Sequence, residues 1–195
     1  MNYLAHAYLS FNDPQILAGN MISDYVKGRA QFSFSGKIQK GIMLHREIDQ
    51  FTDTHPATKK AKEIFRPAYR LYSGAIMDVL YDHFLANDGT EFTPASLKDF
   101  AARTYRQLEL QAADLPINFL QVFTYMKTYD WLYNYRSLDG MSRSLAGLVR
   151  RSAYLSESAT AYNLFTEHYV FLNGCYHEFF QDVKQFAKDQ FDSLL

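Results

Sequence analysis

Apolar residues recur every three or four positions along most of this chain, which is the period of an amphipathic α-helix. No segment sustains the alternation of apolar and polar residues that a half-buried strand requires. Capping residues, prolines and glycines divide the pattern, and Pro67 and Gly74 are expected to kink or split the third segment. The predicted helices span residues 14–27, 36–54, 56–87, 94–114, 116–136, 138–151 and 156–195. The pattern predicts an all-α fold, a single-domain irregular bundle of about seven to nine helices over residues 1–195.

Two of these helices carry charged residues inside an apolar stripe. The second helix places a histidine and a carboxylate one turn apart in the stripe Ile38, Ile42, His45, Asp49 and Thr52. The third repeats the same spacing with two carboxylates in the stripe Leu71, Ala75, Asp78, Asp82 and Leu85. A weaker case in the first helix aligns Leu17, Asn20 and Asp24. The three stripes together predict a cluster of polar side chains facing the core.

A buried carboxylate requires a positive partner, because an uncompensated charge costs several kcal/mol. Pairing with basic side chains is one solution, since His45, His83 and Arg46 lie on helices that are expected to face the cluster. Carboxylates outnumber these groups, so a divalent metal is the simpler solution. Mixed imidazole and carboxylate ligands suit Mn²⁺, Fe²⁺, Zn²⁺ or Mg²⁺. Either solution is compatible with the residues alone.

Composition and charge exclude several other classes of protein. Apolar residues make up 48% and charged residues 21%, which is typical of a folded domain, and a net charge of −1 indicates no attraction to nucleic acid. Cys175 is alone, so disulfides and cysteine zinc sites are excluded, and a buried apolar role is expected for it. The chain has no signal-peptide pattern and no membrane-length apolar segment, so a cytoplasmic protein is expected.

The remaining candidates for chemistry are weaker. His6 shares a helical face with Asn2 and could be a metal ligand, a neighbour of one, or a packing residue. His55 precedes a proline and is expected in a turn, and Arg150 with Arg151 is expected at a solvated helix end. No glycine-rich phosphate loop or nucleophile elbow occurs, and the repeated Glu-x-x-His pattern of di-iron bundles is absent.

Four segments carry a resemblance to a known family. They are residues 1–6 (MNYLAH), 19–28 (GNMISDYVKG), 41–53 (GIMLHREIDQFTD) and 78–85 (DVLYDHFL), with looser matches at 130–132 and 135–136. In order and spacing they resemble the acyl carrier protein phosphodiesterase family. The resemblance implies hydrolysis of the phosphodiester between 4′-phosphopantetheine and a serine of holo-acyl carrier protein. It also implies a divalent metal, with Mn²⁺ expected and Mg²⁺ or Fe²⁺ as alternatives, and an HD-domain-like helical fold.

One departure limits how far residue roles can be transferred. HD phosphohydrolases carry a His-Asp dipeptide, whereas this chain has only the reversed pair Asp82-His83. The working hypothesis is a metal-activated water. The predicted metal ligands are Asp24, His45, Asp49 and Asp82. The predicted catalytic residues are Asp78 as base, His83 or His6 as proton donor, and Arg46 on the phosphoryl oxygens.

The partner implied by the resemblance is an acidic protein. Residues 1–70 carry ten Lys and Arg against six Asp and Glu, so an acidic partner is expected to approach this part of the chain. The predicted docking residues are Lys27, Arg29, Lys37, Lys40, Arg66 and Arg70. Two alternatives stay open, namely an HD-like phosphohydrolase acting on a nucleotide or other small phosphodiester, and a non-catalytic helical binding module. The sequence leaves the oligomeric state open.

Overall fold

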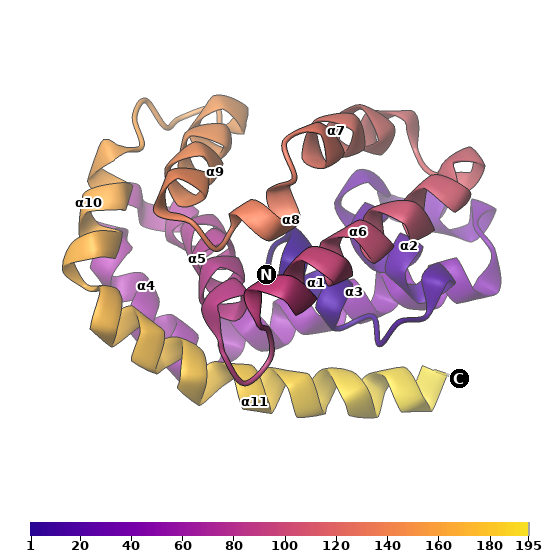
Figure 1. Ribbon diagram of the computed structural model, residues 1–195, viewed down its shortest axis with the longest axis horizontal. Coiled ribbons are helices and arrows are strands. Elements are labelled where there is room, and N and C mark those ends of the chain that lie inside the picture. The colour runs from indigo at the N-terminus through magenta and orange to yellow at the C-terminus, as the bar shows by residue number, and fades with distance from the viewer. Residues whose placement is uncertain (195) are drawn as a thin grey trace.

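The computed structural model describes residues 1–194, which form eleven α-helices and no strand (Figure 1). The all-α prediction is confirmed. The first six helices are α1 (Tyr3–Tyr8), α2 (Pro14–Ile22), α3 (Gly36–Thr54), α4 (Pro56–Tyr69), α5 (Ser73–Asn87) and α6 (Pro94–Leu110). The remainder are α7 (Ile117–Thr128), α8 (Trp131–Asn134), α9 (Leu138–Arg151), α10 (Ala159–Glu167) and α11 (Tyr169–Leu194). Short 3₁₀ turns connect them at Ser23–Tyr25 (η1), Gly28–Ser33 (η2), Arg70–Tyr72 (η3) and Ala112–Asp114 (η4).

Capping residues fix where several helices begin. Asp13 accepts hydrogen bonds from the backbone N–H groups of Gln15 and Ile16, and Pro14 follows it as the first residue of α2. Thr93 and Ser96 exchange side-chain and backbone hydrogen bonds at the start of α6. These caps explain why the predicted starts of α2 and α6 are correct.

The predicted helix over residues 56–87 is divided, and the break lies between the two residues expected to cause it. Arg70 adopts a left-handed φ of 49°, so α4 ends at Tyr69 and a 3₁₀ turn leads into α5. This break turns Leu71 outward, where it is 97% exposed. The prediction that Leu71 belongs to the buried stripe is therefore wrong.

Four other predicted boundaries are also wrong, and one of them is the end of the fourth helix, which lies at Leu110 instead of residue 114. The first helix ends at Ile22 instead of near residue 27, because the chain tightens into η1. The segment 116–136 is two helices, since Asp130 takes a left-handed φ of 45° between α7 and α8. The segment from residue 156 divides at His168 into α10 and α11. These divisions and the helix α1, which lies before the first predicted segment, bring the helix number to eleven among residues 1–194, above the seven to nine expected.

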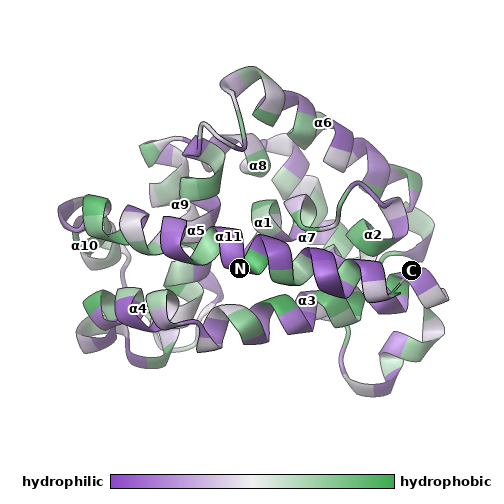
Figure 2. Ribbon diagram, turned by 90° about the horizontal axis from the view of Figure 1, so that it is seen from below, coloured by the Kyte–Doolittle hydropathy of each residue, from purple (hydrophilic) through white to green (hydrophobic). Residues whose placement is uncertain are grey.

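The helices share one core, and α2 with α3 forms its closest pair. A Cβ atom on Gly19 would lie 2.1 Å from the carbonyl oxygen of Ile38, and one on Gly41 would lie 2.4 Å from that of Ile16. Only glycine allows this approach. The long helix α11 runs beneath α3 and α4 (Figure 1), and its hydrophilic residues show on the outside when the molecule is seen from below (Figure 2).

No helix within residues 1–194 has the length and apolar character needed to cross a membrane.

Candidate metal centre

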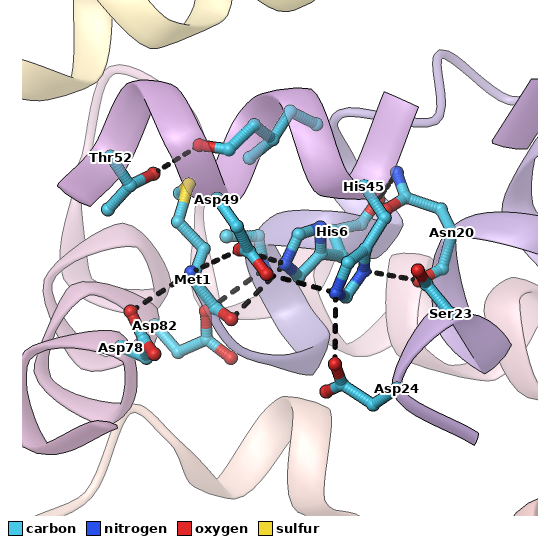
Figure 3. A network of polar contacts seen from close by, with 12 residues as sticks. Met1, His6, Asn20, Ser23, Asp24, His45, Asp49, Thr52, Asp78 and Asp82 are labelled. Atoms are coloured by element: carbon cyan, nitrogen blue, oxygen red, sulfur yellow. Dashed lines mark hydrogen bonds and ion pairs between the residues drawn. The ribbon is translucent and has the colours of Figure 1, made fainter. Parts of the chain in front are cut away.

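Two histidines and a carboxylate converge where α1 meets α3 (Figure 3). His6 from α1, His45 from α3 and Asp49 one turn after His45 each offer one ligand atom, and these three atoms lie within 4.8 Å of one another. The two imidazole rings stack with centroids 3.8 Å apart and planes 14° apart. This spacing could hold a metal ion.

A backbone carbonyl fixes the orientation of His45. The Nδ1–H of its ring donates to the carbonyl oxygen of Asn20 over 2.7 Å, so in the neutral ring Nε2 carries the lone pair. Nε2 is buried without a hydrogen bond and lies 3.1 Å from Asp49 Oδ2 and 3.4 Å from Asp24 Oδ1. A lone pair facing two carboxylates is repulsive unless a cation lies between them. An imidazole anchored through its other nitrogen is the usual arrangement of a metal ligand, so the residues fit a metal.

The local field attracts positive charge to this point. Burial acts to lower the pKa of His45, but Asp24 and Asp49 outweigh it and raise the pKa to about 9. Burial acts to raise the pKa of Asp49, yet the Met1 ammonium and the neighbouring imidazoles hold it well below its usual range. A proton on His45 therefore occupies the place that a divalent cation would take.

His6 lies deeper than His45 and remains neutral. Burial and the adjacent His45 lower the pKa of His6 to about 4. Its Nε2 lies 3.2 Å from Asp49 Oδ1, and its Nδ1 is buried without a hydrogen-bond partner. The Asn20 side-chain amide and the Ser10 hydroxyl both donate to the His6 carbonyl, over 2.9 and 2.7 Å. Asn20 thus positions both histidines, through its carbonyl and its amide.

Asp82, predicted as a metal ligand, contacts backbone instead. It is fully buried, and its two oxygens accept the N–H groups of Leu4 and Ala5 over 2.8 and 3.0 Å at the start of α1. Burial raises the pKa of Asp82 to about 7, although these two N–H groups oppose the shift. In this arrangement Asp82 anchors the helix that carries His6.

Asp78 and Asp24 lie at opposite edges of the cluster (Figure 3). The buried Met1 ammonium lies 3.0 Å from Asp78 Oδ1 and 3.0 Å from Asp49 Oδ1, which joins Asp78 to the centre. The Asp78 side chain is 35% exposed, whereas that of Asp24 is 77% exposed in η1. The centre therefore opens toward solvent on both sides.

The two remaining predicted residues do not contact this cluster. His83 points from α5 toward Tyr169, and its two ring nitrogens lie 2.7 Å from the Tyr135 carbonyl oxygen and 3.1 Å from the Tyr169 hydroxyl. The Arg46 guanidinium donates to the Gln31 side chain and to the Val26 carbonyl. These contacts hold the segment that follows Asp24 against α3.

Sequence patterns did not indicate two contributors, the Met1 ammonium and the Asn20 carbonyl. One is the terminus of the main chain and the other is a backbone carbonyl, so no side chain in the sequence indicates either of them. The glycines Gly19 and Gly41, which bring the Asn20 carbonyl to His45, were the available clue.

Comparison with known proteins identifies the family of this chain. The family model for acyl carrier protein phosphodiesterase matches residues 1–183. The chain belongs to the acyl carrier protein phosphodiesterase family. The resemblance stated from the four segments is confirmed, and the family name is that of an enzyme that cleaves phosphodiesters.

Similar proteins cover almost the whole chain. Those of Enterobacter sp. (strain 638) and Yersinia pestis, both named acyl carrier protein phosphodiesterase, are 31% and 32% identical to it. The first alignment covers 97% of this chain and 99% of the relative, and the second covers 96% and 98%. No solved structure matches the chain.

Proposed function

We propose that this protein hydrolyses the phosphodiester of holo-acyl carrier protein and releases apo-acyl carrier protein and 4′-phosphopantetheine. The family match over residues 1–183 supports the substrate. The observation that carries the chemistry is the buried Nε2 of His45, which faces Asp24 and Asp49 and forms no hydrogen bond. An HD-like arrangement of the helices remains a prediction.

The proposed metal ligands are His6, His45 and Asp49, with Asp24 as a fourth group at the exposed edge. A divalent cation, for which Mn²⁺ is our first choice, would supply Lewis acidity at the phosphoryl oxygens and lower the pKa of water. Asn20 and Asp82 position the two histidines. Asn20 contacts the ring of His45 and the backbone of His6, and Asp82 holds the start of the helix that carries His6. This assignment moves His6 from proton donor to ligand and Asp82 from ligand to anchor.

The reaction adds water across the bond between phosphorus and the serine oxygen. Asp78 is the proposed base that takes a proton from the attacking water, since its carboxylate borders the cluster and is partly exposed. The bond to the serine oxygen breaks, and the phosphate stays on the pantetheine. The serine oxygen takes a proton from solvent as it departs. We assign no proton transfer to His83, which contacts Tyr135 and Tyr169.

A basic groove next to Asp78 suits an acidic protein partner. It has a volume of about 660 Å³, and its charged lining residues are Asp53, Lys62, Arg66, Arg70 and Asp78. The exposed Leu71 borders the same groove. We propose that the carrier docks here, so that its modified serine reaches Asp78 from the side of α4 and α5.

The six predicted docking residues are not equivalent. Arg66 and Arg70 line the groove, and Arg66 also pairs with Glu63. Lys37 and Lys40 do not line the groove, since Lys37 pairs with Asp13 and Lys40 donates to the Leu194 carbonyl. Lys27 and Arg29 are exposed in the segment that follows Asp24. The proposed docking surface is the part of the groove lining formed by Lys62, which pairs with Asp53, and by Arg66, Arg70 and Leu71. The four other predicted docking residues do not line the groove and are left out of this surface.

The test is to incubate the protein with holo-acyl carrier protein and Mn²⁺ and to weigh the carrier by mass spectrometry. Conversion of the carrier to the apo mass supports the proposal. Nucleotides and small phosphodiesters are assayed in parallel. Turnover of those compounds with an unchanged carrier would favour the nucleotide-type phosphohydrolase, and no turnover of any of them would favour a binding module. His177→Ala, at an exposed histidine, is the control variant and should behave as wild type.

A further inference from the structure

A second cavity, apart from the basic groove, lies between α7, α8 and α9. It has a volume of about 660 Å³. Figure 1 shows α7 and α9 on either side of α8, with the N-terminus behind it. Asn2 and Tyr3 line the cavity together with residues of these three helices. The sequence patterns gave no indication of this cavity.

Two arginines meet in this cavity without a carboxylate partner, because Asp139, the acidic residue of the lining, pairs with Arg143. The guanidinium groups of Arg150 and Arg151 lie 3.7 and 3.6 Å from the position that a Cβ atom of Gly147 would take, so both fold back over the same point of α9. Neither forms an ion pair with a side chain of residues 1–194, whereas Arg143 pairs with Asp139. Like charges converge at a cost unless an anion joins them. Both arginines are exposed in the last turn of α9, so the prediction of a solvated helix end is confirmed, and their convergence is an additional feature that the sequence did not indicate.

The other walls of the cavity are aromatic. Tyr125 and Tyr129 are 60% and 56% exposed and stack along α7, with ring planes 2° apart. Trp131 and Tyr135 complete this side. Exposed rings with hydroxyl groups suit a slender ligand that is apolar in parts and carries amides.

The N-terminal residues connect this cavity to the metal centre along the chain. Met1 contacts Asp49 and Asp78 there, and the next two residues line the cavity. The Tyr3 hydroxyl lies 2.8 Å from the hydroxyl of Tyr25, the residue after Asp24. Burial raises the pKa of Tyr3, while Arg151 acts to lower it and Asp24 to raise it further. The Tyr3 hydroxyl is thus within electrostatic reach of both sites.

We propose that this cavity binds the 4′-phosphopantetheine arm, with the phosphate toward Arg150, Arg151 and Tyr3 and the amide chain along Tyr125, Tyr129 and Trp131. The inference rests on the proposed function, for which it names the site of the arm. The carrier protein then docks on the basic groove beside Asp78, and its arm occupies the opposite side of the metal centre. The arm is a neutral chain that ends in one phosphate. The cavity is complementary to it, because its aromatic wall ends in two unpaired guanidinium groups.

The chain carries its own reporter for this proposal, because Trp131 is the only tryptophan in the sequence and lines the cavity. The full chain, without added metal, is titrated with 4′-phosphopantetheine, pantetheine and inorganic phosphate while Trp131 fluorescence is followed. We expect 4′-phosphopantetheine to change the fluorescence saturably and to bind at least about tenfold more tightly than pantetheine, which lacks the phosphate. Equal affinity for inorganic phosphate would overturn the proposal, because the cavity would then be only an anion site.

Variants distinguish binding of the phosphate end of the ligand from binding of its pantetheine chain. Arg150→Gln with Arg151→Gln should weaken 4′-phosphopantetheine binding about tenfold or more and leave pantetheine binding unchanged. Arg103→Gln, at an exposed arginine of α6, is the matched control and should change neither. Unaltered binding of 4′-phosphopantetheine to the double variant would overturn the proposal.

The titration does not depend on turnover, so it can fail separately from the proposed function. Wild-type protein that converts the holo carrier but shows no saturable Trp131 response to 4′-phosphopantetheine would overturn the cavity proposal and leave the activity intact. Protein that binds the free arm through these arginines but leaves the holo carrier unchanged would support the cavity and overturn the proposed hydrolysis.

Discussion

His45 donates its Nδ1–H to the backbone carbonyl of Asn20 over 2.7 Å, and this contact spans the interface between α3 and α2. Because the acceptor is a backbone atom, its position depends on how closely the two helices pack. Gly19 and Gly41 set that distance. The orientation of the proposed metal ligand is therefore decided at two residues that carry no side chain.

Gly41→Ala tests this dependence. The new Cβ would lie 2.4 Å from the Ile16 carbonyl oxygen and 2.9 Å from the Gly19 Cα, so the helices must separate. We expect the free energy of unfolding to fall by about 1–3 kcal/mol and the affinity for Mn²⁺ to fall about 10- to 100-fold. Denaturant unfolding and metal titration measure the two effects.

Gly174→Ala is the matched control for this substitution. Gly174 lies in α11, where a Cβ would meet no atom within 4 Å. Its replacement should leave Mn²⁺ binding unchanged and stabilise the protein by roughly 0.5–1 kcal/mol through helix propensity. Equal Mn²⁺ affinity in both variants would show that the close packing of α2 and α3 does not orient His45.

Asp82 gives a second prediction, because it joins α5 to the start of α1. Asp82→Ala leaves the N–H groups of Leu4 and Ala5 buried without an acceptor, which should lower the free energy of unfolding by about 1–3 kcal/mol. Asp82→Asn retains one acceptor oxygen and should lose less stability. If Asp82 were a direct metal ligand, both variants would lose Mn²⁺ binding equally while stability stayed near wild type.

The sequence predicted the α3 part of the centre well, because α3 is one uninterrupted helix. Ile38, Ile42, His45 and Thr52 are all buried, and Asp49 lies on the same face, as the spacing indicated. The periodicity failed at Leu71, where the left-handed backbone of Arg70 ends the helix. A single residue in that conformation leaves no mark on the spacing of apolar positions.

The tertiary contacts could not be predicted from spacing within one helix. His6 was assigned an uncertain role because its partner His45 lies on another element. Asp82 was expected to contact a cation, whereas its positive partners are two backbone N–H groups. In both cases the missing information was the placement of α1 against α3 and α5.

The basic groove predicts a salt-dependent encounter with the acidic carrier. Raising the ionic strength from about 0.01 M to 0.15 M shortens the screening length from about 30 Å to 8 Å, so the KM for holo-acyl carrier protein should rise several-fold. Lys62→Gln with Arg66→Gln should raise KM at low salt and flatten its salt dependence. Arg103→Gln, at an exposed arginine of α6 that lines neither the groove nor the second cavity, removes a charge of the same kind and is the control. Identical salt profiles for all three proteins would exclude docking at the groove.

Asp13 predicts a pH dependence of stability that is independent of the metal centre. Burial acts to raise the pKa of Asp13, but Lys37 and the N–H groups of Ile16 and Gln15 lower it overall. A lowered pKa in the folded state adds stability above about pH 4, and this contribution is lost as the pH falls through the lowered value. Asp13→Ala should cost about 1 kcal/mol at neutral pH through loss of the helix cap.

Asp13→Asn separates the charge from the cap, because asparagine also caps helices. Its stability should lie between those of wild type and Asp13→Ala at neutral pH, and should approach that of wild type in acid. Denaturant unfolding at successive pH values from about 7 to about 3 measures this. A constant difference between wild type and Asp13→Asn over that range would contradict the assigned shift.

The most direct test of the proposed metal-dependent hydrolysis is the mass of holo-acyl carrier protein after incubation with chelator-treated protein, before and after Mn²⁺ is added. The proposed centre predicts an unchanged carrier without metal, conversion to the apo mass when Mn²⁺ is added to wild type, and no conversion by His45→Ala under the same conditions. Circular dichroism should show that the helicity of this variant is retained. Conversion by the chelator-treated protein, or full conversion by His45→Ala, would contradict the account.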